Sequence, residues 1–161
     1  MSRSASAPTA ARDAACTCSR LRRATRAITQ LYDDAMAGTG LRVTQFSLLR
    51  NLARAGPVRV TALAGLLLLE RTALSRTLDP LVDAGYVEVT RGRDARTREV
   101  SITRAGREAL ASALGPWKRA QAEVARKVGA AKLEGLYATL VELEALHPGA
   151  AERHASKDEV A

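Results

Sequence analysis

The 161-residue chain has few aromatic residues, few cysteines and no long hydrophobic run, and each shortage excludes a class of protein. Phe, Trp and Tyr together make up 3% of the residues, which argues against a single-strand nucleic-acid binder that stacks bases on aromatic rings. Two cysteines are too few for a disulfide-stapled secreted domain. The longest apolar run, Ala62–Leu69, falls well short of the roughly 20 residues that a membrane span requires.

Signals for targeting and for catalysis are equally scarce. The N-terminus lacks the apolar stretch of a signal peptide, so we expect a cytoplasmic protein that does not contact membranes. No Gly-rich phosphate loop, nucleophile elbow or cluster of metal ligands appears, and neither His147 nor His154 lies among candidate catalytic partners. We therefore expect that the protein is not an enzyme and uses no cofactor or metal.

Positive charge is in excess. The chain has 25 Lys and Arg residues against 17 Asp and Glu, a formal net charge of +8, and most of the cations are arginine. Arginine suits bidentate recognition of phosphates and guanine edges. Such a surplus favours a polyanionic partner, and the scarcity of aromatic residues directs the expectation to double-stranded DNA.

The length predicts one domain, covering residues 14–147, between a disordered lead (1–13) and a flexible tail (148–161). Apolar residues at helical spacing predict a first helix up to residue 36. Thr44 is expected to cap a second helix that Gly56-Pro57 ends, and Thr61 is expected to cap a third. A very short strand (58–60) precedes the third helix, and a fourth helix spans roughly residues 71–84.

Two β-prone runs follow, "YVEV" and "EVSI", with an arginine-rich loop between them. Thr103 is expected to cap the next helix, in which Pro116 predicts a kink, and a last helix reaches His147. This order predicts a mostly α fold with a small β wing. The predicted fold is a winged helix-turn-helix (residues 41–104) with helical extensions at both ends (14–37 and 105–147).

The fourth predicted helix has the composition of a helix that lies in the major groove of DNA. Its apolar stripe would bury one face, and the opposite face would present hydroxyl and guanidinium groups. Hydroxyls bond phosphates or base edges, and each good Arg–guanine pair discriminates by about 1–3 kcal/mol. The predicted contacts on this helix are Arg71, Thr72, Ser75 and Arg76, and Arg59 and Thr61 beside the preceding turn complete the set.

The stretch "RGRDARTR" between the strands contains four arginines and one aspartate. Asp94 could hold Arg96 in a charge-assisted pair and aim it into the minor groove, whose potential is strongly negative. The neighbouring cations would neutralise phosphates without reading sequence: Arg91, Arg93 and Arg98. The alternative interpretation is a loop that is merely solvated.

Residues 41 to 110 resemble the MarR family of bacterial regulators. The similarity lies in "LRVTQFSLLRNL", "LSRTLDPLVDAGYV", the wing "RGRDARTREVSIT" and "TRAGREAL". The resemblance implies a homodimer, formed by the helices in 14–37 and 105–147, on a pseudo-palindromic operator. It also implies a pocket between these helices and the winged region, where small aromatic or phenolic anions act as inducers.

Three positions depart from the family pattern. Leu68 stands where the family usually has Gly, so Leu would be strained there if the turn requires a positive φ. Glu70 replaces the commoner Asp before the recognition helix and is a weaker cap. Pro80 lies within that helix, cannot donate to the carbonyl of Arg76, and predicts a local kink.

Candidate effector contacts are an aromatic cluster and two cations: Arg22, Tyr32, Phe46, Arg50 and Trp117. The alternative is that the aromatic residues belong to the core. Cys16 and Cys18 could form a redox switch, as in relatives that sense peroxide, or be small residues at a dimer contact. As positions i and i+2 of one helix they would point about 200° apart and would not pair with each other.

The sequence therefore predicts a ligand-responsive transcriptional regulator that binds double-stranded DNA, and a repressor rather than an activator. Two alternatives remain open. One is a regulator that responds to oxidation through its cysteines. The other is a winged-helix protein whose basic face binds a protein or another anionic partner without preference for an operator.

Overall fold

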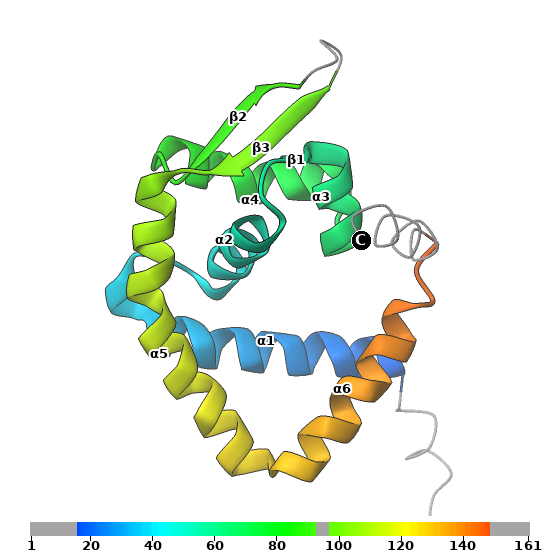
Figure 1. The fold of residues 1–161 in the computed structure, drawn as a ribbon. Coiled ribbons are helices and arrows are strands. Elements are labelled where there is room, and N and C mark those ends of the chain that lie inside the picture. The colour runs from blue at the N-terminus through cyan, green and yellow to red at the C-terminus, as the bar shows by residue number, and fades with distance from the viewer. Residues whose placement is uncertain (1–15, 93–96, 149–161) are drawn as a thin grey trace, which may run out of the picture.

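In residues 16–92 and 97–148, which the computed structural model describes, helices predominate and a small sheet lies at one end (Figure 1). The helices are α1 (Thr17–Met36), α2 (Val43–Ala55), α3 (Val60–Leu67), α4 (Arg71–Asp83), α5 (Arg104–Val128) and α6 (Ala130–Glu144), with a short 3₁₀ turn η2 (Ala37–Thr39). The strands are β1 (Val58–Arg59), β2 (Val87–Arg91) and β3 (Arg98–Ile102). The predicted fold, mostly α with a small β wing, is confirmed.

The sheet is antiparallel with the strand order β1-β3-β2. Strand β3 is central, with Val100 opposite both Val58 of β1 and Val89 of β2. Alternation along β3 turns Val100 and Ile102 inward, and both are buried. The β2–β3 hairpin extends beyond this anchored part, away from α1, α5 and α6, as Figure 1 shows.

The main core lies within the winged region, between α2, α3, α4 and the sheet. The apolar stripe predicted for the fourth helix is buried as expected, with Leu74, Leu78 and Leu81 exposed by 0%, 5% and 1%. A second, smaller cluster joins the terminal helices α1, α5 and α6. Its buried members are Tyr32, Ala120, Val124 and Leu133.

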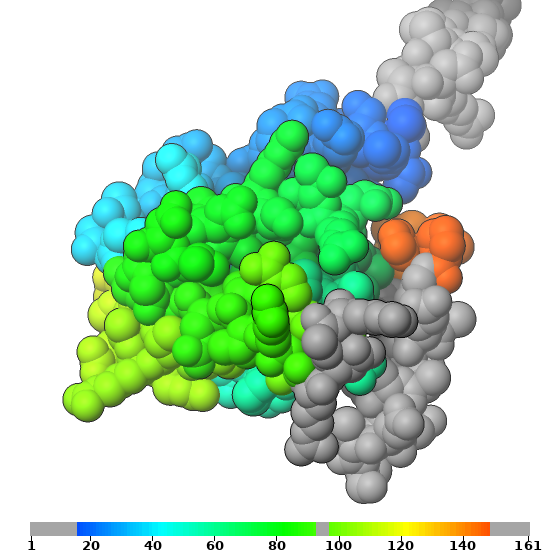
Figure 2. All heavy atoms as spheres, turned by 90° about the horizontal axis from the view of Figure 1, so that it is seen from above, coloured from blue at the N-terminus to red at the C-terminus, as the bar shows by residue number. Residues whose placement is uncertain are grey.

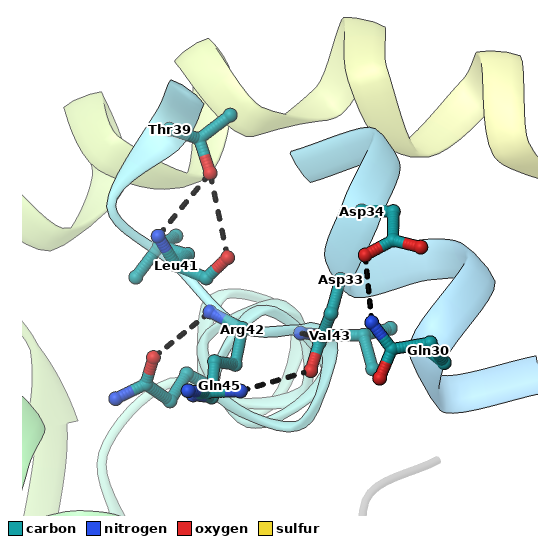
Figure 3. Close-up of polar contacts among 8 residues, drawn as sticks. All are labelled: Gln30, Asp33, Asp34, Thr39, Leu41, Arg42, Val43 and Gln45. Atoms are coloured by element: carbon teal, nitrogen blue, oxygen red, sulfur yellow. Dashed lines mark hydrogen bonds and ion pairs between the residues drawn. The ribbon is translucent and has the colours of Figure 1, made fainter. Parts of the chain in front are cut away.

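The two predicted caps of α2 and α3 were wrong. Helix α2 begins at Val43 with Arg42 as its N-cap, so Thr44 lies inside the first turn. The Gln45 side chain accepts from the Arg42 N–H over 2.9 Å, and Asp33 of α1 accepts from the next N–H along the chain. The Val43 N–H donates to Asp33 Oδ1 over 2.7 Å, and Arg42 Nη1 lies 3.3 Å from Asp33 Oδ2 (Figure 3). Helix α3 begins at Val60, so Thr61 lies inside its first turn. A carboxylate of another helix thus replaces the expected local cap of α2.

The predicted cap of α5 is confirmed. Thr103 caps α5 by accepting a hydrogen bond from the Gly106 N–H over 3.1 Å. Leu68 ends α3 in the left-handed region (φ 53°, ψ 37°), as expected for a position where relatives have Gly. Helices α4 and α5 continue through Pro80 and Pro116. The last helix ends at Glu144, a few residues before the predicted end at His147. Among the described residues, none of the helices has the length and hydrophobicity to cross a membrane.

Candidate nucleic-acid interface and internal cavity

The exposed side of α4 presents the polar side chains that the sequence predicted for it. Arg71, Thr72, Ser75 and Arg76 are all exposed, and the leucines of the same helix face the core. Glu70 occupies the N-cap position and its side chain makes no capping hydrogen bond. The N-terminal half of α4 therefore presents hydroxyl and guanidinium groups on its exposed side, the composition typical of a helix that contacts a DNA groove.

A hollow of about 330 Å³ lies between α4, the start of α3 and the base of the hairpin. Its walls bring together predicted contacts from four segments of the chain: Arg59, Thr61, Arg71, Ser75 and Arg98. Asp79 is the carboxylate among its lining residues. Seen from the wing side, the green segment from α3 through the hairpin forms the middle of this face of the molecule (Figure 2).

The wing holds like charges in register. Arg91 of β2 lies directly opposite Arg98 of β3 in the antiparallel ladder, and both side chains are exposed. Like charges directly opposite one another destabilise a strand pair, and an anion bound between them removes that penalty. Gly92 continues the pairing by donating its N–H to the Thr97 carbonyl over 3.0 Å. The predicted contacts Arg93, Asp94 and Arg96 lie outside the described residues.

A second cavity, of about 320 Å³, lies where α1 and α5 meet α2. Four of the five predicted effector contacts line it: Tyr32, Phe46, Arg50 and Trp117. The fifth, Arg22, is not among the lining residues. It precedes Ile28, a lining residue, by six positions on α1, which is about 9 Å along the helix axis. Arg22 therefore lies beyond the rim of this cavity along α1, and the lining gives no support to its predicted role in the effector site.

The aromatic wall of the cavity is stacked. The rings of Phe46 and Trp117 lie 5.5 Å apart between centroids at an interplanar angle of 23°. The Cζ atom of Arg50 lies 4.5 Å from the centroid of Trp117, within cation–π range. Trp117 is half-buried and packs against both core clusters. The two sequence interpretations, core and cavity wall, therefore both apply to it.

Tyr32 closes the cavity on the α1 side and is 8% exposed. Its hydroxyl donates to Gln121 Oε1 on α5, and Gln121 Nε2 donates to the Tyr137 hydroxyl on α6 over 2.9 Å. Burial first, and then the neighbouring Tyr137, raises the pKa of Tyr32 above its ordinary value, so the hydroxyl remains a donor at neutral pH. Gln121 and Tyr137 were not among the predicted contacts, because no local sequence pattern indicates a bond between residues so distant in the chain.

The cysteines lie at the start of α1, and both are exposed. Cys16 is the N-cap with an extended backbone, and Cys18 lies in the first turn. The prediction that both cysteines lie within the first helix is therefore wrong for Cys16, which precedes Thr17. No group of three or more potential metal ligands occurs within residues 16–92 and 97–148.

Comparison with known proteins identifies the family. The family model "MarR family" matches residues 41–97. The M. tuberculosis transcriptional regulator MosR, solved in complex with DNA, is 35% identical over 87% of this chain and 98% of its own, with a TM-score of 0.71. Among curated proteins, none gives a significant match.

Two further DNA complexes share the fold at lower identity. The transcriptional repressor CouR, bound to a 23-mer duplex, is 24% identical over 86% of this chain and 99% of its own, with a TM-score of 0.74. A mutant of E. coli MarR in complex with operator DNA is 21% identical over 76% of this chain and 89% of its own, with a TM-score of 0.70. With the matched family model and the similarity to MosR, these observations establish that the chain belongs to the MarR family of transcriptional regulators.

Proposed function

We propose that the protein is a sequence-specific, double-stranded DNA-binding repressor that acts as a homodimer on a pseudo-palindromic operator and is released by a small-molecule effector. The observation that carries the proposal is the hollow between α4 and the wing. Three arginines, Arg59, Arg71 and Arg98, converge there beside the hydroxyls of Thr61 and Ser75. This chemistry suits a phosphate backbone that passes between helix and wing.

The proposed contacts divide into residues that read base edges and residues that bind phosphates. Thr72, Ser75 and Arg76 on the exposed side of α4 would read base edges in the major groove. Arg91 and Arg98, opposite each other in the wing, would bind phosphates, which relieves their mutual repulsion. At the tip of the wing, Asp94 would orient Arg96 toward the minor groove, as the sequence suggests.

Exposed apolar side chains on the terminal helices support the homodimer. Helix α6 buries Leu133, whereas Leu136, Tyr137 and Val141 on the same helix are 44%, 49% and 65% exposed. On α1, Ile28 is 42% exposed. A second copy of the chain would cover these side chains, and the dimer would present two recognition helices and two wings to the two halves of an operator.

The cavity at Trp117 is the proposed effector site. The guanidinium of Arg50 lies over the Trp117 ring, and among the described residues no carboxylate lies within ion-pair distance of it. A small aromatic or phenolic anion would place its ring against Phe46 and Trp117 and its charge beside Arg50. The cavity adjoins both regions of the molecule, so an occupant can change how the winged region sits on the terminal helices. A repressor released in this way acts on the chromosome, in the cytoplasm.

The test is fluorescence anisotropy with the duplex upstream of this protein's own gene, against a scrambled duplex, across a salt series. We expect tight binding to the first duplex alone, with one dimer per site, and release on addition of a small aromatic acid. Equal weak binding to both duplexes that vanishes with salt would instead indicate a basic surface without an operator. A pull-down for a protein partner would then be the next step.

The exposure of both cysteines supports a second candidate function, regulation by oxidation. Cys16 at the N-cap of α1 is accessible to an oxidant, and Cys18 lies in the adjacent turn. Oxidation with hydrogen peroxide before the same anisotropy measurement would then weaken operator binding, and a double Cys16→Ser, Cys18→Ser variant would be insensitive. Equal sensitivity of the variant and the unaltered protein would reject this candidate.

A further inference from the structure

Three polar side chains are joined by hydrogen bonds that lead from the cavity to an exposed residue of α6. Tyr32 forms part of the cavity wall, Gln121 of α5 bonds it, and Tyr137 of α6, which is 49% exposed, bonds Gln121 in turn. Each side chain comes from a different terminal helix: α1, α5 and α6 in that order. Among the described residues, the Gln121 side chain alone is hydrogen-bonded to both tyrosines.

The two tyrosines at the ends of this hydrogen-bonded series have different surroundings. Tyr32 is 8% exposed, so its hydroxyl depends on Gln121 for a hydrogen-bond acceptor. Tyr137 is 49% exposed and stands among the uncovered apolar side chains of α6, beside Leu136 and near Val141. One end therefore forms a wall of the proposed effector cavity, and the other belongs to the surface proposed to bind a second copy of the chain.

We propose that Gln121 is a positioning residue that couples occupancy of the cavity to assembly of the dimer. The proposal rests on the proposed effector cavity and on the proposed homodimer. A partner packed on α6 restricts the rotamers of Tyr137. Tyr137 then holds the Gln121 amide in place, and the amide holds Tyr32 as a fixed wall of the cavity. A fixed wall lowers the ordering cost of binding, so the dimer binds a cavity ligand more tightly than the monomer does.

Coupling of this kind is reciprocal. If dimerisation raises the affinity for a cavity ligand by some factor, the ligand must stabilise the dimer by the same factor. Allosteric couplings in proteins typically amount to about 5- to 150-fold. A ligand should therefore slow the dissociation of the dimer, and removal of the Gln121 amide should abolish that effect while leaving both binding sites in place.

The experiment uses two readouts on the full chain. Trp117 is the only tryptophan in the sequence and lines the cavity, so its fluorescence reports binding of 4-hydroxybenzoate as the probe. Subunit exchange between differently labelled copies, followed by energy transfer, reports dissociation of the dimer. We expect the probe to slow exchange about fivefold or more in the unaltered protein and less than about twofold in Gln121→Leu and Tyr137→Phe.

Two variants separate coupling from simple structural damage. Gln121→Glu keeps an acceptor for Tyr32 and offers one to the Tyr137 hydroxyl, so it should retain most of the slowing. Gln30→Leu removes an exposed amide of α1 that bonds only Asp34 among the described residues, and it should behave like the unaltered protein. A loss of coupling in Gln30→Leu equal to that in Gln121→Leu would overturn the proposal.

The remaining outcomes are distinct. Binding of the probe with equal slowing in the unaltered protein and Gln121→Leu would show that coupling bypasses Gln121, and this would overturn the inference alone. Binding without any change in exchange would do the same. No response of Trp117 to the probe would remove the proposed effector role of the cavity, and absence of exchange because the chain is monomeric would remove the homodimer. Either result would also overturn this inference.

Discussion

The winged region and the terminal helices differ in how completely one chain buries them. In the winged region Leu49, Leu52, Leu63 and Leu74 are 0% exposed, and the sheet adds Val100 at 0%. Over its 20 residues, helix α1 buries Tyr32 and Met36, both near its C-terminal end, and α6 buries Leu133. The winged region therefore forms most of its core within one copy, whereas α6 leaves Leu136, Tyr137 and Val141 more than 40% exposed.

The junction between these regions is small and specific. Asp33 of α1 caps α2, and the stacked pair Phe46 and Trp117 joins α2 to α5. The cavity lies at this junction, with Tyr32 on one side and Arg50 on the other. A ligand there contacts both regions at once, which is the position from which it can change their relative orientation.

The largest effect should follow from disrupting the exposed apolar surface of α6. Val141→Asp places a charge on the apolar side of α6, where the side chain is 65% exposed in the single chain. It should dissociate the dimer at little cost to the fold of each copy. A monomer contacts one half-site, so we expect affinity for the operator to fall by about 100-fold or more. Size-exclusion chromatography and anisotropy check both results.

Thr139→Asp is the matched control, because this exposed residue, two positions before Val141, points about 160° away from it around α6. It should leave the dimer and the affinity unchanged. A dimeric Val141→Asp protein that still binds the operator tightly would place the interface elsewhere.

Substitutions in the core of the winged region should lower the unfolding free energy and leave dimerisation unchanged. Leu74→Ala empties a fully buried position in the main core and should cost about 2–5 kcal/mol of unfolding free energy. Urea denaturation in the monomeric Val141→Asp background measures this loss without the contribution of dimerisation. Leu114→Ala, at a position on α5 that is 37% exposed, should cost less than about 1 kcal/mol. Equal losses for the two would mean that the winged core is not the stable part.

Within the winged region, residues that read bases and residues that bind phosphates should respond differently to substitution. Arg76→Ala should weaken binding to the operator by about 1–3 kcal/mol and relax sequence preference. Arg91→Ala should weaken all duplexes alike and lower the salt slope by about 1. Anisotropy with operator and scrambled duplexes across a salt series distinguishes them. Equal losses on both duplexes for both variants would reject this division of labour.

The junction itself is tested at Asp33. Asp33→Ala leaves the Val43 N–H without its acceptor and removes the partner of Arg42, and we expect a loss of about 1 kcal/mol. Most of this should come from the cap, since Arg42 is largely exposed. Asp34→Ala, which removes only a bond to Gln30 on the surface, should be nearly neutral by thermal unfolding. A neutral Asp33→Ala would mean that water replaces the carboxylate as the cap.

The fold was predictable where the signals are local. The leucine spacing of α4, the glycine after it and the β-prone runs around the arginine loop each act over a few residues, and each prediction was confirmed. The starts of α2 and α3 were not predictable in this way. Thr44 is a good local cap, but Asp33 of a different helix bonds the Val43 N–H, and the N-cap is Arg42, two residues before Thr44.

At the candidate site, too, features set by local sequence were predictable and those set by tertiary packing were not. The aromatic residues and Arg50 were expected at one pocket and do line one cavity. Arg22 precedes Tyr32 by ten positions on α1, about 15 Å along the helix axis, so sequence spacing alone argues against placing both at one small pocket. The link through Gln121 joins three helices whose arrangement is set by tertiary packing, so composition and spacing gave no sign of it.

Leu68 offers the smallest and most local test. Its positive φ of 53° is the one such angle at a non-glycine residue within the described ranges, and it carries a cost that glycine does not have. Leu68→Gly should raise the unfolding free energy by up to about 1 kcal/mol, after the entropy that glycine adds to the unfolded chain is subtracted. Leu66→Gly, two residues earlier in α3 and 46% exposed, should lower it by about 1 kcal/mol. Opposite signs from the same substitution would locate the strain in the turn between α3 and α4, and equal losses would show that Leu68 is held there without strain.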